Sequence, residues 1–432
     1  MTELSLQQQF ADSLGQLLGP EFPSDIALAV SGGGDSMAML YLAHNWTRDW
    51  GVRLHVVTVD HGLRPESADE AAMVASECAA LGWRHVTLTW SWDGSGNKMD
   101  AARRARLALI DDWRGQIAHV LMAHTEDDLA ETFLMRLRRG AGLDGLAAMA
   151  PKRFVTGKAG SGFHVIRPCL GMARKDLRHY LRTLQGPWVD DPSNDDPRYD
   201  RARIRRLLSA LGDEGLDRRV LAAAATRLRT EKAVVAQHAA RIWQEIGEDV
   251  VTQGARTGIV RLKPDWHRAV DVATQRRILS AVLRYVSSTD YPPRAEALEV
   301  FRDRLVSGGT GPLHGCDAVV LDGWTYLFRE LTSVAPPCVL AQPETLWDGR
   351  WLARRSGRAV VQIRALGEDG WRQIPDKPGQ ILRHRLALSL PSVWEGDHLL
   401  ACPALGFGSG QHITLRPKGQ IGADLSDFLL SH

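Results

Sequence analysis

A glycine-rich turn between an apolar segment and a helical segment constrains the fold of this chain most strongly. Residues 26–30 are a short apolar run, as in a strand buried on both faces, and the residues from Ser36 onward have helical apolar spacing. Glycines let the backbone approach a ligand and direct several N–H groups into one concavity, to which a helix N-terminus adds partial positive charge. The turn therefore predicts a phosphate-binding loop of Ser31, Gly32, Gly33, Gly34, Asp35 and Ser36.

The loop differs from two common phosphate-binding signatures. No Gly-Lys-Ser or Gly-Lys-Thr follows it, as in P-loop kinases, and its glycines are contiguous rather than spaced as in the dinucleotide fingerprint. A carboxylate, Asp35, lies at the start of the helix, where it would repel a phosphate unless a cation lay between them. Asp35 is therefore predicted to bind Mg²⁺, directly or through water. In the alternative interpretation, the segment is an ordinary strand–helix turn that Asp35 caps.

Strand-like and helix-like segments alternate through the first part of the chain. Strands are expected at residues 26–30, 53–59, 85–90 and 117–123, with helical segments between them. Because the strands recur about every 30 residues, the pattern is typical of an α/β fold with a doubly wound parallel sheet. A helix over residues 4–19 is expected to pack against this sheet.

Polar side chains follow these strands at their carboxyl ends, which is the edge where open α/β sheets bind ligands. Asp60 and His61 follow one strand, and a second group follows the strand at 117–123. In that second group, spacings of three and four residues place several titratable side chains on one face of a helix. The alternative is that these acids only cap turns and helices. The second group consists of His124, Asp127, Asp128 and Glu131.

Arginines gather on two further segments. Arg103 lies on a predicted helix at 99–113, beside the exit of the third strand, and is a candidate phosphate contact. The segment 198–206 holds five arginines, a pattern that suits the docking of a nucleic-acid backbone. A solvated helix face is the alternative for both segments.

Changes in composition divide the chain into three predicted domains. Residues 1–212 form the α/β domain, and residues 213–335 form a mainly helical domain with a hairpin at 317–330. Residues 336–432 contain short strand-like segments between Gly and Pro turns, so they are expected to form a small β-rich domain.

The glycine loop resembles the Ser-Gly-Gly-x-Asp-Ser pyrophosphate loop of the ATP-pyrophosphatase superfamily, whose members cleave ATP between the α- and β-phosphates. Further motifs, which cover about half of the chain, occur in the order seen in the bacterial tRNA(Ile)-lysidine synthetase family. They are VDHGLR at 59–64, DAARRAR at 100–106, AHTEDDLAET at 123–132, RRGAGLDGL at 138–146, RPCL at 167–170, DDPSND at 190–195 and RARIRRLL at 201–208.

Three positions depart from the pattern of that family. Asp100 stands where the family usually has Glu, and Thr125 where it commonly has a second His. Ala202 stands where the family has Asn, so one hydrogen bond to RNA or within the protein is lost there.

The resemblance implies a substrate and a reaction. The C2 oxygen of the wobble cytidine in a tRNA(Ile) with a CAU anticodon would be adenylated by ATP with Mg²⁺, and the ε-amine of free L-lysine would then displace AMP to give lysidine. Such an amine must be held and deprotonated, so carboxylates are expected near the base.

The resemblance also assigns roles to residues. ATP would be bound by the glycine loop with Asp60 and His61, and Mg²⁺ by Asp35. Lysine would be bound by Asp127, Asp128 and Glu131. Catalysis would rest on Asp35, Arg103, His124 and Asp127. The tRNA would be bound by Arg138, Arg139, Arg201, Arg203, Arg205 and Arg206.

The composition is that of an ordinary globular protein, with 432 residues and a net charge of +2. The five cysteines are scattered and form no Cys-x-x-Cys pair, which argues against a disulfide framework and against a zinc or iron–sulfur site. No signal-peptide pattern and no apolar run of roughly 20 residues is present, so a cytoplasmic location without a membrane partner is expected. The sequence leaves open whether the chain forms a homodimer.

Two other functions fit the sequence less well. A tRNA thiolase of the same superfamily would need a cysteine in a loop of the site, whereas Cys78 lies within a predicted helix and Cys169 follows Arg167-Pro168. A non-catalytic tRNA-binding protein with a decayed loop would have no reason to keep Ser31 and Asp35.

Overall fold

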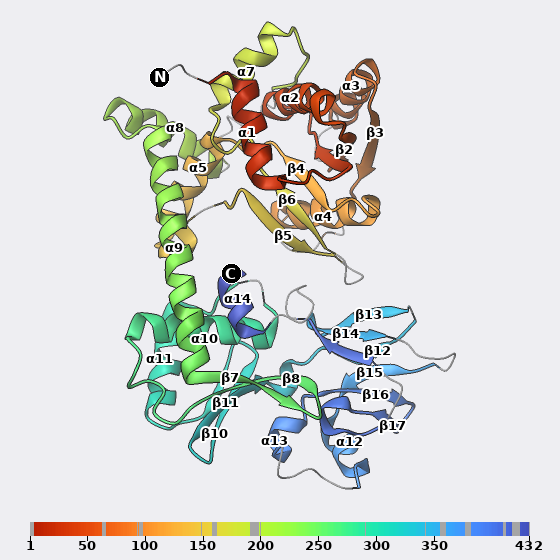
Figure 1. The fold of residues 1–432 in the computed structure, drawn as a ribbon, viewed down its shortest axis with the longest axis vertical. Coiled ribbons are helices and arrows are strands. Elements are labelled where there is room, and N and C mark those ends of the chain that lie inside the picture. The colour runs from red at the N-terminus through yellow and green to blue at the C-terminus, as the bar shows by residue number, and fades with distance from the viewer. Residues whose placement is uncertain are drawn as a thin grey trace. The chain divides into compact units, whose positions relative to one another are not determined.

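A computed structural model describes the fold (Figure 1). The described residues are 4–62, 66–92, 94, 98–147, 149–157, 162–190, 198, 200–289, 291–341, 343–354, 360–375, 382–408, 412–416 and 424–431. They divide into two compact units, of which the N-terminal unit extends through Lys232 and the C-terminal unit begins at Ala233.

A six-stranded sheet forms the centre of the N-terminal unit, with the strand order β3-β2-β1-β4-β6-β5. All neighbouring pairs are parallel except β5 with β6. Because β2 and β3 extend the sheet on one side of β1 whereas β4 lies on its other side, the strand order reverses between β1 and β4. The parallel α/β prediction is confirmed. The strands are β1 Asp25–Ala29, β2 Arg53–Asp60, β3 Arg84–Thr89, β4 His119–Met122, β5 Lys152–Thr156 and β6 Gly162–Ile166.

Helices cover both faces of this sheet, as the alternation of side chains along β1 requires. Ile26 and Leu28 are buried in one apolar cluster with residues of the first two helices, and Ala27 is buried in another cluster with Ile110. The helices of this unit are α1 Leu6–Leu18, α2 Gly34–Trp50, α3 Ser67–Ala80, α4 Lys98–Trp113, α5 Glu126–Leu137, α6 Leu143–Leu146, α7 Arg174–Thr183 and α8 Asp200–Asp213, followed by α9 Arg218–Ile246.

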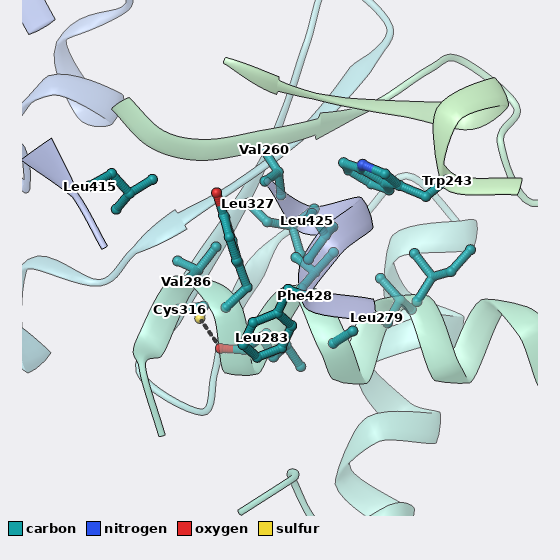
Figure 2. Packing of buried hydrophobic residues seen from close by; sticks show 14 of the residues in the cluster. Trp243, Val260, Leu279, Leu283, Val286, Cys316, Leu327, Leu415, Leu425 and Phe428 are labelled. Carbon is teal, nitrogen blue, oxygen red and sulfur yellow. Dashed lines mark hydrogen bonds between the residues drawn. The ribbon is translucent and has the colours of Figure 1, made fainter. Parts of the chain in front are cut away.

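The C-terminal unit begins with a five-stranded sheet in the order β7-β8-β11-β10-β9, on which α10 and α11 pack. Figure 2 shows Leu279 and Leu283 of α10 among residues of this core, where the Cys316 thiol donates a hydrogen bond to the Leu283 carbonyl at 3.3 Å. The elements are β7 Gly247–Thr252, β8 Ala255–Leu262, α10 Val272–Ser287, α11 Ala295–Val306, β9 Gly311–Leu313, β10 Cys316–Leu321 and β11 Trp324–Arg329.

Two smaller sheets complete the C-terminal unit, in the orders β12-β15-β16-β17 and β13-β14-β18. No helix in the described part of the chain is long and apolar enough to cross a membrane. The remaining elements are the 3-10 helix Leu331–Ser333, β12 Cys338–Val339, β13 Glu344–Trp347, β14 Trp351–Arg354, β15 Gln362–Ala365, α12 Gly367–Gln373, α13 His384–Ala387, β16 Pro391–Glu395, β17 His398–Ala401, the 3-10 helix Pro403–Leu405, β18 His412–Leu415 and α14 Leu425–Ser431.

The predicted three-part division differs from these two compact units. The structural boundary falls after Lys232, within the long helix α9, whereas the boundary predicted from the sequence, at 212/213, lies at the end of α8. The second predicted boundary, at 335/336, lies within the C-terminal unit, whose largest apolar cluster contains Ile278 as well as Trp347. The three-domain division therefore stays a prediction about which segments fold independently.

Candidate active site

The glycine loop connects β1 to α2 at the point where the strand order reverses. Gly32 has a φ of +83°, which favours glycine. The Ser36 hydroxyl accepts a hydrogen bond from the Ser31 N–H at 3.1 Å and donates one to the Gly33 carbonyl at 2.8 Å. These two hydrogen bonds connect the beginning of the loop with the first turn of α2.

The segment after α7 lies along this loop. The Val189 N–H donates to the Gly32 carbonyl at 3.0 Å, and Val189 and Gly33 form a parallel bridge. From α7, Arg178 forms an ion pair with Asp190 at 2.8 Å. A Cβ atom built on Gly34 would lie 3.4 Å from the Arg178 side chain, so this glycine leaves room for that arginine. Sequence analysis does not predict that this segment contacts the loop.

Asp35 lies in the first turn of α2 and does not cap it, because the N-cap residue is Gly33. Asp35 Oδ2 accepts a hydrogen bond from Arg174 Nε at 2.8 Å, whereas Oδ1 is buried and has no hydrogen-bond partner among the described residues. Burial raises the pKa of Asp35, and the positive charge of Arg174 opposes this effect.

A buried, unpartnered carboxylate oxygen beside the glycine loop fits the prediction that Asp35 is a Mg²⁺ ligand. The described residues contain no group of three or more His, Cys, Asp or Glu side chains that could enclose a metal ion. Mg²⁺ bound with a nucleotide needs no such group, because one or two carboxylates, the phosphates and water complete its coordination.

In the first turn of α5, the Asp128 carboxylate both takes part in the helix cap and pairs with positively charged side chains. Thr125 is the N-cap of α5, and Asp128 Oδ2 accepts hydrogen bonds from the Thr125 N–H at 3.0 Å and from its hydroxyl at 2.9 Å. Arg174 Nη2 lies 3.5 Å from the same oxygen, and Arg201 Nη2 lies 4.0 Å from Oδ1. Burial alone would raise the pKa of Asp128, but Arg174, His124 and Arg201 hold it below its ordinary value.

The neighbouring Asp127 contacts two later segments of the chain. Its Oδ2 accepts the Arg174 backbone N–H at 2.8 Å, at the first turn of α7, and its Oδ1 lies 3.0 Å from Arg218 Nε at the start of α9. Asp127 therefore anchors the beginnings of two helices close to the glycine loop.

Glu131 is fully buried, with 0% of its surface exposed, and three arginines surround it. Its Oε1 lies 2.7 Å from Arg205 Nε and 3.3 Å from Arg174 Nη1, and its Oε2 lies 3.8 Å from Arg201 Nε. A buried carboxylate is tolerated when it is paired in this way. The geometry gives Glu131 a structural role, holding three guanidinium groups beside the other two acids of α5.

His124 lies at the carboxyl end of β4 and is neutral near pH 7. Burial lowers its pKa to about 4, and the positive charge of Arg167 contributes, although Asp128 opposes the shift. Arg167 Nε donates a hydrogen bond to His124 Nδ1 at 3.3 Å. The imidazole proton must therefore be on Nε2, where it is available as a hydrogen-bond donor.

Asp60 and His61 lie at the end of β2. Asp60 Oδ1 accepts the Gly62 N–H at 2.8 Å, so this carboxylate shapes its own turn. His61 Nε2 lies 3.4 Å from Arg106 Nη2, and burial, aided by Arg106, lowers the pKa of His61 to about 4. Arg103 is exposed on the same helix, α4, one turn before Arg106.

Five of the six arginines predicted to bind tRNA fall into two sets. Arg201 and Arg205 turn inward to the acids of α5. Around Asp200, which lies at the surface, Arg138 Nη2 approaches Oδ1 to 2.8 Å, Arg139 Nη2 lies 3.7 Å from Oδ2, and Arg203 also pairs with Oδ1. The remaining residue, Arg206, is exposed.

A family model described as a PP-loop domain matches residues 6–211. A tRNA(Ile)-lysidine synthase from Ruegeria pomeroyi is 38% identical over 438 residues, which cover 98% of this chain and 98% of that protein. This chain belongs to the tRNA(Ile)-lysidine synthase family. Relatives of the same name come from Hyphomonas neptunium, 37% identical over 72% of this chain and 83% of that protein, and from Wolbachia pipientis wMel, 32% identical over 89% and 90%.

Membership of the lysidine synthase family confirms the resemblance inferred from the motifs. The PP-loop match includes the glycine loop and the acids of α5 but ends before Arg218, which the full-length relatives cover. The cysteines also disfavour the thiolase alternative. Cys78 and Cys169 are buried, and burial raises the pKa of each thiol, to about 12 for Cys78.

Several charged residues of this candidate site are not predicted from the sequence. Arg174, Arg178 and Arg218 contact the loop segment or the acids, and Arg167 donates to His124. One signal could have pointed to them: Arg174 and Arg178 are four residues apart at the start of α7 and so share one face of that helix. Sequence analysis assigns them no function.

The low pKa of His124 predicts how this residue affects stability at different pH values. Its ordinary pKa is 6.5 and its folded-state pKa is about 4, so the unfolded chain binds the proton more readily between these values. We therefore compare the free energy of unfolding of the wild type with that of His124→Asn. Any excess stability of the wild type is expected to be at its full value above pH 6.5 and to decrease as the pH falls towards 4. Urea unfolding of both proteins at pH 7.5, 6 and 5 would measure the difference. If the stability advantage of the wild type over the variant increased as the pH was lowered, the expectation would be contradicted.

Proposed function

We propose that this chain joins free L-lysine to C2 of the wobble cytidine, position 34, of a tRNA(Ile) with a CAU anticodon. ATP is the activating substrate, and AMP and pyrophosphate are released. The observation that carries this proposal is the match along 98% of the chain to a protein named tRNA(Ile)-lysidine synthase. The position of the glycine loop beside a cluster of acids and arginines supports the proposal.

In the first step, the cytidine O2 attacks the α-phosphorus of ATP, and the bond from that phosphorus to the bridging oxygen of pyrophosphate breaks. We assign the pyrophosphate to the N–H groups of the glycine loop and the N-terminus of α2. Mg²⁺, when bound by Asp35, neutralises charge on the phosphates. His124 Nε2–H and the exposed Arg103 are the proposed additional donors to phosphate oxygens, and Asp60 and His61 are proposed to contact ATP.

In the second step, the lysine ε-amine attacks C2, and the bond from C2 to the AMP oxygen breaks. The ammonium group must first lose a proton, and a carboxylate near the base can accept it. Asp128 suits this role best, because among the described residues the ionic partner of its Oδ1 is the distant Arg201 alone. We keep Asp127 and Glu131 as predicted lysine contacts, although Glu131 already pairs with three arginines.

The tRNA backbone is assigned to the exposed arginines. Arg138, Arg139, Arg203 and Arg206 lie at the surface near the carboxyl end of α5 and on α8, where their guanidinium groups can contact phosphates. Arg201 and Arg205 instead hold the acids of the site. Because tRNA and free lysine occur together in the cytoplasm, we propose that the enzyme acts there.

Incorporation of radiolabelled lysine into a tRNA(Ile) transcript with a CAU anticodon tests the proposal. We expect incorporation that requires both ATP and Mg²⁺. A transcript with U at position 34 is the matched control and should accept no lysine, because the reacting base is absent. Release of AMP with another acceptor, and no incorporation of lysine, would overturn the assignment of substrates while keeping an adenylating enzyme.

A further inference from the structure

The guanidinium group of Arg174 joins three carboxylates that come from two different elements. Its Nε lies 2.8 Å from Asp35 on α2, its Nη1 lies 3.3 Å from Glu131, and its Nη2 lies 3.5 Å from Asp128, both on α5. Arg201 and Arg205 also pair with acids of α5, but among the described residues Arg174 is the arginine that contacts all three carboxylates.

Loss of Arg174 would affect the three carboxylates unequally. Glu131 would keep Arg205 and Arg201, and Asp128 would keep the N–H and hydroxyl of Thr125. Asp35 has no other hydrogen bond or ion pair among the described residues, and its Oδ1 already lacks a partner. Of the three acids, only Asp35 is therefore left without a direct partner when Arg174 moves away.

The backbone of Arg174 is fixed independently of its side chain. Asp127 Oδ2 accepts the Arg174 N–H at 2.8 Å, and this residue begins α7. The side chain can therefore change its contacts while the helix stays in place. Glu131 and Asp128 would keep the guanidinium beside the glycine loop after it released Asp35.

We propose that Arg174 is a positioning residue that occupies the cation position on Asp35 until Mg²⁺ arrives with ATP. It holds the Asp35 carboxylate in place without ligands and then releases Asp35, so that its Nε–H becomes free to donate to a phosphate oxygen. The inference rests on the proposed function only in taking Asp35 as a Mg²⁺ ligand. It follows that free Mg²⁺ competes with Arg174 and binds weakly in the absence of nucleotide.

Binding of Mn²⁺, used as a paramagnetic substitute for Mg²⁺, tests this competition in the full-length chain without nucleotide, tRNA or lysine. The electron paramagnetic resonance signal of free Mn²⁺ gives the affinity. Arg174→Gln is expected to bind Mn²⁺ at least about tenfold more tightly than the wild type, since a charge-assisted hydrogen bond no longer has to be broken. Unchanged or weaker binding by this variant would overturn the proposal.

Arg178→Gln is the matched control. Arg178 lies one turn further along α7 and acts on Asp35 only through its charge, while it pairs with Asp190. Its removal should tighten Mn²⁺ binding less than the removal of Arg174 does. An equal gain would show that loss of positive charge suffices, which would overturn the proposed role of the Arg174–Asp35 contact. Adding Asp35→Asn to Arg174→Gln should abolish the gain, and a gain that persists would place the metal elsewhere.

Arg174→Lys provides a second test if Arg174→Gln does not fold. Lysine keeps the charge but concentrates it on a single nitrogen, so it cannot reproduce the three separate nitrogen contacts that the guanidinium group makes with Asp35, Asp128 and Glu131. It should bind Mn²⁺ more tightly than the wild type, and equal affinity would overturn the proposal. Because these assays contain neither lysine nor tRNA, a failure of the proposed ligation reaction would leave their outcome unchanged.

Discussion

Replacing Glu131 by glutamine is expected to lower the free energy of unfolding by about 3–5 kcal/mol, the range found when one partner of a buried ion pair is removed. Glu131 is fully buried, and its two oxygens pair with Arg174, Arg201 and Arg205. Glutamine has nearly the same shape but no charge. The guanidinium groups of the three arginines would therefore lose the negative charge that Glu131 contributes to the cluster. Urea unfolding of the full-length protein, followed by fluorescence, would measure the loss.

Asp200→Asn is the control for this prediction. Asp200 also pairs with three arginines, Arg138, Arg139 and Arg203, but it lies at the surface. Water screens such pairs, so this variant should change the unfolding midpoint little. Equal losses in the two variants would contradict the view that burial makes the Glu131 cluster important.

Replacing Asp35 by asparagine is expected to lower ATP-dependent lysine incorporation about 10²–10³-fold, as is typical when one electrostatic contact to the transition state is lost. Asparagine preserves the size of the side chain but removes the charge that attracts Mg²⁺. The hydrogen bond from Arg174 can be retained by the amide oxygen, so the fold should persist. Initial rates with saturating lysine and tRNA would measure the effect.

Asp25→Asn is the matched control for Asp35→Asn. Asp25 begins β1, the strand whose opposite end leads into the glycine loop, and it pairs with Arg53 and His55. Because Asp25 is remote from the loop along the strand, this variant should retain most of the activity. Activity of Asp35→Asn within tenfold of the wild type would rule out a Mg²⁺-binding role for Asp35.

The sequence predicted the scaffold of the site because the patterns that define it are local. An apolar strand, three glycines and a helix are contiguous, and the polar groups at 60–61 and 124–128 directly follow strands. The rule that ligands bind at the carboxyl edge of a parallel sheet then places these groups together. The structure has the expected parallel sheet, with β1 between β2 and β4.

The pairing of charges could not be predicted, because the partners are far apart in the sequence. Arg174 and Asp35 are separated by 139 residues, and no local pattern indicates that they meet. Whether Asp128 caps α5 or binds a ligand also depends on the orientation of its side chain. In the C-terminal unit, the β7–β8 hairpin was missed, although its turn contains Gln253 and Gly254, both with positive φ, as in a tight two-residue turn.

The order of acids and arginines along the chain has a consequence for how the site forms during synthesis. Asp35, Asp127, Asp128 and Glu131 all precede Arg174 in the chain, whereas their partners extend to Arg218. During synthesis from the N-terminus, the ribosome therefore releases all four acids before any of the arginines that pair with them here. The sheet strands β1 to β4 are complete by then, but the electrostatic balance of the site is reached only when about half of the protein has been translated.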